Sequence, residues 1–175
     1  MRIVTAEQMR RIEQDAFERG VDPFGLMGVA GQAAARAILA RLGERATGAR
    51  ALVLVGPRNN GGDGLVIAEA LAQAGVRSTL WLYRRDGLGG APVADDLVAR
   101  LPMIRYEEDP ELVALRRILA DSTVVIDAIY GIGGRSGLAP ELDAALQAAN
   151  ERGRIARCSI TSQAGTGSAN SAMFQ

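Results

Sequence analysis

A short apolar run passes directly into a glycine-rich segment in the first half of the chain. The run Ala51-Leu-Val-Leu-Val55 has the length and composition of a buried strand. The segment Gly56–Gly64 leads from it into Leu65–Ala74, which has the pattern of a helix that ends at Gly75. A buried strand that turns tightly into a helix is typical of a β-α-β unit, so this stretch favours an α/β fold.

Strands and helices alternate along most of the remaining sequence. We expect further strands at 78–83, 103–106 and 123–127, and helices at 5–19, 26–42, 92–101, 110–120 and 140–152. Repeated β-α-β units place parallel strands side by side and cover them with helices. The sequence therefore predicts an α/β protein with three layers, in which helices cover both faces of a mostly parallel sheet.

The chain contains no histidine and no lysine, because all of its 20 basic residues are arginines. This excludes a Ser-His-Asp triad, a histidine-bound zinc ion and a Schiff-base lysine. Twenty acidic residues bring the net charge to zero, so we expect no nucleic-acid partner and no anionic membrane surface as partner. The single cysteine excludes an internal disulfide, and no apolar run indicates a signal peptide. We expect a cytoplasmic protein.

The glycine-rich segment Gly56–Gly64 is the strongest indication of a ligand. Backbone N–H groups and the positive end of the helix dipole converge where a strand turns into a helix. We expect the glycines of this segment to adopt positive φ and to let the backbone approach a ligand closely. The alternative is an ordinary tight turn with Asp63 as the N-cap of the helix. More polar side chains lie among these glycines than a turn requires, so the segment predicts a nucleotide-type ligand.

A second glycine-rich segment, Ala128–Gly137, follows the expected strand at 123–127. Asp127 lies at the carboxyl end of that strand, where a carboxylate requires a hydrogen bond, a counter-charge or a cation. Ligands bind beyond the carboxyl ends of parallel strands, so the two segments can border one cleft. The alternatives are that Asp127 caps its own loop and that Arg135 is a solvated arginine. Neither segment contains a Walker A lysine, and the first lacks the Gly-x-Gly-x-x-Gly of ordinary dehydrogenases.

Four motifs, in order, resemble the YjeF N-terminal domain family of NAD(P)H-hydrate epimerases. They are Thr5-Ala-Glu-Gln-Met9, Leu26-Met-Gly-Val-Ala-Gly31, Asn59-Asn-Gly-Gly-Asp-Gly64 and Val125-Ile-Asp-Ala-Ile-Tyr-Gly131. The resemblance covers roughly residues 1–157 and implies a Rossmann-like fold. It also implies an isomerase that interconverts the R and S epimers of hydrated NADH and NADPH, a potassium ion, and a homodimer. The pathway partner it implies is an ATP- or ADP-dependent NAD(P)H-hydrate dehydratase.

The resemblance also assigns residues to the site. Potassium ligands would be Asn60, Asp127 and Ser162. The residues that bind the substrate would be Asn59, Asn60, Gly61, Gly62 and Asp63 of the first segment and Gly131, Ile132, Gly133, Gly134, Arg135, Ser136 and Gly137 of the second.

The chain departs from the family at the last active-site strand. The family pattern Val-Ala-x-Asp-x-Pro-Ser-Gly falls on residues 156–163, which puts Ser159 at the position of the catalytic aspartate and Gln163 at that of the glycine. A serine hydroxyl is a poor general base without an activating neighbour, so this departure predicts weak epimerase activity. The alternative function is a catalytically silent nucleotide-binding module of the same family.

The last 18 residues carry no charge, whereas all 40 charged residues lie in residues 1–157. We therefore divide the chain into a YjeF N-terminal-like domain at 1–157 and an atypical uncharged tail at 158–175. Our hypothesis is that the tail results from a frame change or truncation, which would leave the sheet incomplete at the C-terminus. Unpaired strand edges and exposed apolar surface would then favour aggregation.

Overall fold

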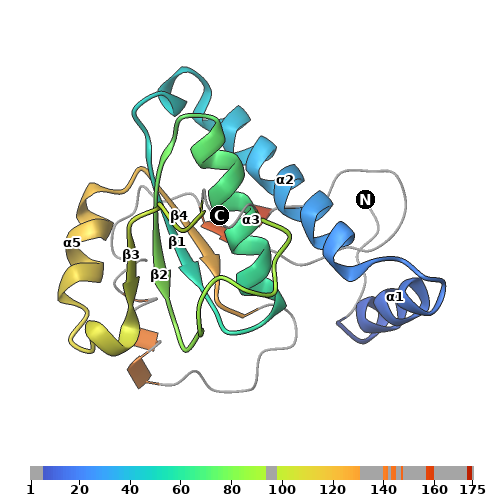
Figure 1. Ribbon diagram of the computed structural model, residues 1–175. Helices are drawn as coiled ribbons and strands as arrows, with labels where there is room; N and C mark the ends of the chain where they lie inside the picture. The colour runs from blue at the N-terminus through green and yellow to red at the C-terminus, as the bar shows by residue number, and fades with distance from the viewer. Residues whose placement is uncertain are drawn as a thin grey trace.

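The structure is a computed structural model of the 175-residue chain. It describes residues 6–93, 98–130, 140–141, 143–144, 147, 157–159 and 173–174. A sheet lies at the centre, with helices on both sides of it (Figure 1). In chain order the elements are α1 (Ala6–Glu18), α2 (Pro23–Leu42), η1 (Gly43–Ala46), β1 (Arg50–Val55), α3 (Asn59–Gln73), β2 (Arg77–Leu82), β3 (Met103–Arg105), η2 (Tyr106–Glu108), α5 (Val113–Asp121), β4 (Val124–Ala128), β5 (Arg157–Ser159) and β6 (Met173–Phe174).

The strand order of the sheet is β3-β2-β1-β4-β5-β6. Every pair from β3 to β5 is parallel, and β6 runs antiparallel to β5. This confirms the predicted mostly parallel sheet. Because parallel strands share their direction, the carboxyl ends of β1, β2 and β4 meet at one edge of the sheet, which we call the carboxyl edge. The opposite edge, where these strands begin, is the amino edge.

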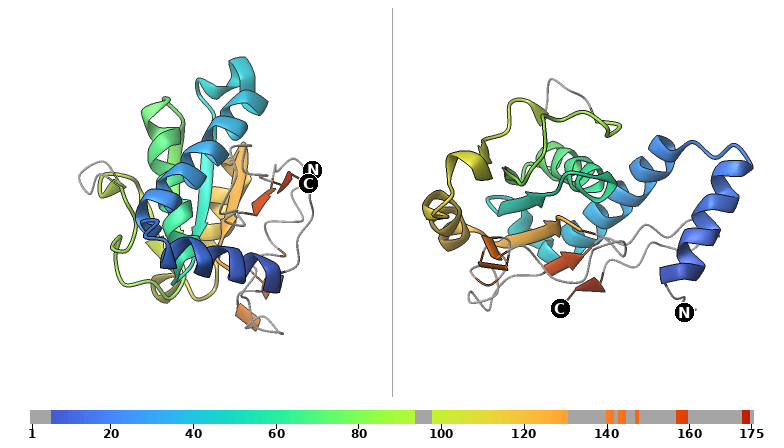
Figure 2. Two further views of the ribbon diagram at one scale, coloured as in Figure 1. Left: turned by 90° about the vertical axis from the view of Figure 1, so that its right-hand side faces the viewer. Right: turned by 90° about the horizontal axis from the view of Figure 1, so that it is seen from below.

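Alternate side chains of β1 enter two separate hydrophobic cores. Val53 and Val55 pack in one core with residues of α2 and α3, whereas Leu52 and Leu54 pack in the other with residues of α5. Two views at right angles show α2 and α3 together on one face of the sheet and α5 on the other (Figure 2). A strand that is apolar on both faces is expected in a parallel sheet covered on both sides. The predicted three-layer αβα sandwich is therefore confirmed.

Small residues bring α2 and α3 into close contact. Ala30 and Ala34 are buried, and a Cβ atom at Gly31 would lie only 2.6 Å from the Cβ of Val66 on α3. No side chain at position 31 could occupy that space without moving the two helices apart. The packing therefore fixes the position of α3 on the sheet, and with it the position of the segment at which α3 begins.

Several helices begin at positions that differ from the predictions. α2 begins at Pro23 because the carboxylate of Asp22 accepts hydrogen bonds from two backbone N–H groups of its first turn, at 3.1 and 2.8 Å. α5 begins later than expected, at Val113, because Asp109 accepts bonds from two N–H groups of that helix at 3.0 and 2.9 Å. Of the predicted helix at 92–101, residues 94–97 lie outside the described residues, and among the others only residue 98 is helical. The predicted helix at 140–152 falls largely outside the described residues.

Helix α1 lies beyond one end of α2 and away from the sheet (Figure 1). It carries an exposed ion pair between Glu7 and Arg11, and the apolar side chains of Ile12 and Phe17 are also exposed. Gly20 follows this helix with φ +84°, as expected for a residue that ends a helix. In the described part of the chain, no helix has both the length and the apolar character needed to cross a bilayer.

Candidate functional site

The two predicted ligand segments begin side by side at the carboxyl edge. β1 and β4 are parallel neighbours, with Val55 opposite Ala128 at their ends. The N–H of Gly56 donates to the carbonyl of Ala128 over 3.1 Å, which joins the first residue after β1 to the last residue of β4. The sequence placed Asn59–Asp63 and Asp127 at strand ends, and the sheet order brings those two ends together.

The first glycine-rich segment is itself helical. α3 begins at Asn59 rather than at Leu65, and its N-cap is Arg58, whose side chain makes no capping bond. The alternative with Asp63 as N-cap is therefore wrong, since Asp63 lies inside the helix and is buried. The first backbone N–H groups of a helix have no partner within it, and they favour an anion or another hydrogen-bond acceptor. This start of α3 is directed to the carboxyl edge of the sheet.

The glycines of this segment do not adopt the positive φ expected from the sequence. They are required for contact with the protein itself. A Cβ at Gly61 would lie 2.0 Å from the carbonyl oxygen of Gly56, and one at Gly64 would lie 2.6 Å from the Cβ of Ala128. A Cβ at Gly62 would likewise lie 2.6 Å from the sulfur of Met27 on α2. These glycines allow α3 to begin against the ends of β1 and β4.

Two asparagines lie in the first turn of α3. Asn59 is exposed, whereas Asn60 is half-buried and its buried Nδ2 atom has no hydrogen-bond partner in the described part of the chain. A buried donor without a partner has a considerable free-energy cost, which a ligand oxygen could remove. Asn60 is therefore the side chain of the predicted set that most clearly points to a bound acceptor.

Asp127 lies in β4 and is half-buried at the carboxyl edge. Its Oδ1 atom accepts a hydrogen bond from the N–H of Ile129 over 3.2 Å, so the carboxylate does tie down the start of its own loop. On its other side, the register of β4 and β5 places the backbone of Asp127 opposite Ser159. The predicted catalytic position thus lies beside the predicted cation ligand.

A buried arginine that the sequence did not single out lies under the first segment. Arg85 follows β2 and is only 8% exposed. Its Nη1 atom donates to the carbonyls of Gly56 at 3.0 Å and Arg58 at 3.1 Å, and its Nη2 atom donates to Gly89 at 2.6 Å. Burial lowers the pKa of this guanidinium from its usual value. Nothing in the sequence distinguishes Arg85 from the adjacent Arg84.

A polar cluster joins the end of β2 to Glu141. The hydroxyl of Tyr83 donates to the Glu141 carboxylate over 3.1 Å, and Arg84 pairs with the same oxygen at 2.7 Å. Burial, followed by the bond to this carboxylate, raises the pKa of Tyr83 to about 12. The pKa of Glu141 is lowered, first by a backbone hydrogen bond and then by Tyr83 and Arg84. Glu141 is therefore ionised and Tyr83 neutral at physiological pH.

The remaining predicted site residues lie outside the described part of the chain. For Ser159 the structure gives the backbone position only. The undescribed residues are Gly131, Ile132, Gly133, Gly134, Arg135, Ser136 and Gly137 of the second segment, and Ser162.

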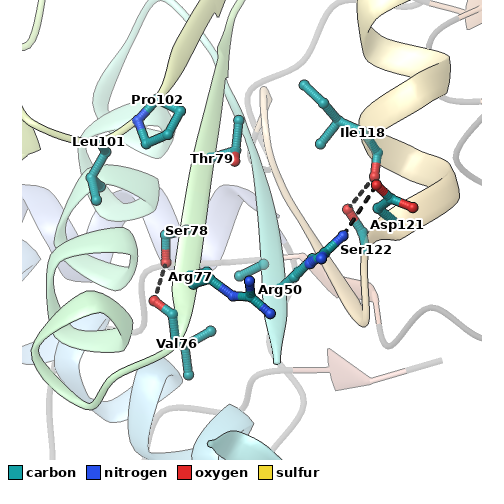
Figure 3. A pocket seen from close by; sticks show the side chains of 11 residues that line it. Arg50, Val76, Arg77, Ser78, Thr79, Leu101, Pro102, Ile118, Asp121 and Ser122 are labelled. Atoms are coloured by element: carbon teal, nitrogen blue, oxygen red, sulfur yellow. Dashed lines mark hydrogen bonds and ion pairs between the residues drawn. The ribbon is translucent and has the colours of Figure 1, made fainter. Parts of the chain in front are cut away.

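A pocket of about 430 Å³ lies at the amino edge, opposite the predicted site (Figure 3). Apolar side chains line much of it, and Arg50 and Arg77 flank it where β1 and β2 begin. Arg50 forms an ion pair with Asp121 at 3.1 Å, and Arg77 donates to the carbonyl of Gly48. Arg50 already has a counter-charge and Arg77 already has a hydrogen-bond acceptor within the protein, so this pocket offers less to a charged ligand than the carboxyl edge does.

Comparison with known proteins identifies similar sequences and a similar fold. The family described as YjeF-related protein N-terminus matches residues 24–172. An NAD(P)H-hydrate epimerase of Roseobacter litoralis is 37% identical over 158 residues, which cover 80% of this chain and 69% of that protein. A bifunctional NAD(P)H-hydrate repair enzyme Nnr of Coxiella burnetii is 32% identical, and the match covers 84% of this chain.

The chain is shorter than many of these relatives. Its match spans 29% of the Coxiella burnetii enzyme and 60% of an NAD(P)H-hydrate epimerase of Dehalogenimonas lykanthroporepellens. Among solved structures, yeast ynu0 superposes with a TM-score of 0.75 at 21% identity, which covers 90% of this chain and 68% of the yeast chain. That similarity supports the fold.

Proposed function

This chain belongs to the family of YjeF-related N-terminal domains, and we propose that it acts as an NAD(P)H-hydrate epimerase, an isomerase that interconverts the R and S epimers of hydrated NADH and NADPH. The observation that carries this proposal is the start of α3 at the carboxyl edge, with the buried and unpartnered Nδ2 of Asn60 beside it. The names of relatives at 32–37% identity supply the substrate class.

The first segment suits the dinucleotide part of such a substrate. Helix N-terminal N–H groups bind phosphate oxygens well because the helix dipole also favours negative charge there. Asn59–Asp63 would hold the substrate from one side, and Gly131–Gly137 would hold it from the other.

A potassium ion fits the chemistry of the proposed ligands. The side chains of Asn60, Asp127 and Ser162 supply an amide oxygen, a carboxylate and a hydroxyl, which are the oxygen donors that a hard cation prefers. When bound, the ion would supply positive charge at the carboxyl edge of the sheet. Asp127 itself orients its loop through the bond to Ile129, which keeps the carboxylate at the end of β4.

The proton-transfer step is where this chain departs from its family. Epimerisation at C6 of the nicotinamide ring requires the C6–O bond of the hydrate to break and re-form on the opposite face, with a proton given to the leaving oxygen and removed from the attacking water. The family has an aspartate for this proton transfer at the position of Ser159. The chain has no histidine or lysine that could activate the hydroxyl of Ser159 by accepting its proton. This position favours the second candidate function, a catalytically silent module that binds the nucleotide without turnover.

We further propose that the chain works in the cytoplasm, as a homodimer, and together with an NAD(P)H-hydrate dehydratase activity that uses ATP or ADP. The names of several relatives describe a bifunctional repair enzyme, and this chain matches less than a third of their length. The dehydratase would consume the S epimer that this chain produces.

A direct assay separates the two candidate functions. The purified chain is incubated with R-hydrate, and the epimer ratio is followed against the spontaneous rate. We expect slow epimerisation, and we expect Ser159→Asp to raise kcat while KM changes little. If both proteins bind the hydrate but only Ser159→Asp epimerises it, the wild-type chain is a catalytically silent module. Absence of both binding and turnover would reject both functions.

A matched pair of variants tests the site itself. Asp127→Asn should weaken binding of the hydrate, whereas Asp121→Asn makes the same change at the amino edge and should leave binding unaltered. Equal affinities of these two variants, measured by calorimetry, would show that Asp127 has no part in the site.

A further inference from the structure

We infer that Arg85 is a positioning residue for the substrate site: its buried guanidinium holds the backbone that leads from β1 into α3. This inference rests on the proposed function, because it gives Arg85 a role in binding the same hydrate. The resemblance to known epimerases did not single out this residue, and its position is visible only in the tertiary structure.

The hydrogen bonds of Arg85 reach two different segments. Gly56 and Arg58 lie directly before α3, and Gly89 lies in the loop after Arg85 itself. The Nη1 atom would lie 2.9 Å from a Cβ at Gly61, so the guanidinium also packs against the first turn of α3. Arg85 thus clamps the segment whose N–H groups and Asn60 side chain would contact the substrate.

The backbone directs the two neighbouring arginines differently. Arg84 has φ +48°, a value uncommon for a residue other than glycine, and the chain changes direction there at the end of β2. The Arg84 side chain is 59% exposed, pairs with Glu141 and lies over the Tyr83 ring at 5.2 Å. Arg85, one residue later, is buried beneath the glycine-rich segment. Arg85 therefore serves as the test residue, and the adjacent, chemically identical Arg84 serves as its control.

Arg85 is a buried charged side chain that lacks a carboxylate partner in the described part of the chain. Its Nε atom is also buried, without a hydrogen-bond partner among the described residues. A buried charge is costly unless hydrogen bonds or a counter-charge compensate it. Backbone carbonyls compensate part of this cost, and a phosphate held at the start of α3 would supply a nearby negative charge.

An arginine is needed here because of the geometry of its donors. The planar guanidinium presents several N–H groups in a fixed fork, so one side chain can reach carbonyls on two sides. A lysine keeps the positive charge but concentrates its donors on one nitrogen. Arg85→Lys therefore separates the role of the fork from the role of the charge.

The main test compares Arg85→Lys with Arg84→Lys in the full chain. For Arg85→Lys we expect kcat/KM for R-hydrate to fall roughly tenfold to a hundredfold, mainly through a higher KM, since misplacing a binding segment has effects of this size. Arg84→Lys should change KM less than twofold, on the order of ordinary surface substitutions. Equal KM values for the two variants would overturn the inference.

Hydrogen–deuterium exchange gives a second readout that does not depend on turnover. Backbone amides of residues 58–62 should exchange faster in Arg85→Lys than in wild type, while those of β1 and β4 should not change. Unchanged exchange at 58–62 would overturn the inference even if the wild type is active. If Arg85→Lys exchanges faster at 58–62 but the wild type does not epimerise the hydrate, the proposed epimerase function is rejected while the positioning role of Arg85 is supported.

Chemical rescue distinguishes positioning from a general loss of stability. Arg85→Ala opens space where the guanidinium was, and added methylguanidinium should lower its KM toward the wild-type value. The same concentration of methylammonium should not, because it lacks the forked donors. Rescue by both cations alike would assign the effect to charge alone and overturn the role of the fork. If Arg85→Ala does not fold, Arg85→Lys and its exchange pattern decide.

Discussion

The two edges of the sheet differ in how exposed their polar side chains are and in whether these side chains have partners. At the amino edge, Arg50 and Asp121 form an ion pair whose side chains are 46% and 64% exposed, and water shares their charge. At the carboxyl edge, Arg85 is 8% exposed and forms no ion pair with the described residues, and Asn60 has a buried donor that finds no partner among them. The amino edge is complete as a folded surface, whereas the carboxyl edge has donors that a ligand could use.

This difference also shows that the size of a pocket does not identify the site. The pocket of about 430 Å³ lies at the amino edge, yet none of its lining side chains, all of them described, is a buried donor without a partner. Buried polar groups normally find partners, so the exceptions indicate where a partner is missing. By that criterion the carboxyl edge is the functional one.

The largest expected effect comes from filling the tight space at the carboxyl edge. Gly61→Ala places a methyl group 2.0 Å from the Gly56 carbonyl, so we expect the free energy of unfolding to fall by about 1–3 kcal/mol. Gly28→Ala is the matched control, because it lies in α2 with 3.6 Å to Pro92. There the free energy of unfolding should rise by about 0.5–1 kcal/mol, as alanine favours the helix.

Urea unfolding of both glycine variants measures this contrast. Hydrate binding should be lost or strongly weakened only in Gly61→Ala. A gain in stability for both variants would contradict the close approach of α3 to the end of β1.

The next effect concerns a polar group near the carboxyl edge that has only a structural role. Asp109 is buried and accepts two backbone bonds at the start of α5, so Asp109→Ala should lower the free energy of unfolding by about 0.5–2 kcal/mol. Affinity for the hydrate should stay the same, as Asp109 serves the face opposite α3. Glu111→Ala, an exposed acid two residues away, is the control and should alter neither. A loss of affinity in Asp109→Ala would extend the site beyond the region defined here.

An effect confined to alkaline pH is expected for Tyr83. Its pKa is raised to about 12, mainly by burial, so folding favours the neutral phenol. The stabilisation is complete below pH 10, the ordinary pKa of the phenol, and is lost as the pH rises from there through about 12. Absorbance titration should show one late phenolate, absent in Tyr83→Phe and present in Tyr106→Phe. Ionisation of Tyr83 near pH 10 would mean that the end of β2 is open to water.

The smallest effect is expected at the amino edge. Asp121→Asn removes the exposed ion pair with Arg50 and should change the free energy of unfolding by no more than about 1 kcal/mol. Added salt should remove even this difference, since exposed charges are screened. A salt-independent loss of several kcal/mol would contradict the view that this edge is solvated and self-contained.

The sequence predicted the elements better than it predicted their starts. β1 and β4 lie within one residue of the apolar runs at 51–55 and 123–127. α3, in contrast, begins at Asn59 and contains glycines that disfavour a helix on their own. Packing against the ends of β1 and β4 overcomes that preference, because only glycines fit there. Local propensity could not reveal a helix that tertiary contacts impose.

By itself, the sequence determined the fold class, the helices on both faces of the sheet and the edge of the sheet at which Asn59–Asp63 and Asp127 lie. Alternating apolar runs and helices fix these features because each element carries its own hydrophobic pattern. Only the tertiary structure decided that Arg85 rather than Arg84 is buried, and that Asp127 lies opposite Ser159. Those outcomes depend on contacts between distant segments, such as the bond from Arg85 to Gly56 across 29 residues, which no local pattern records.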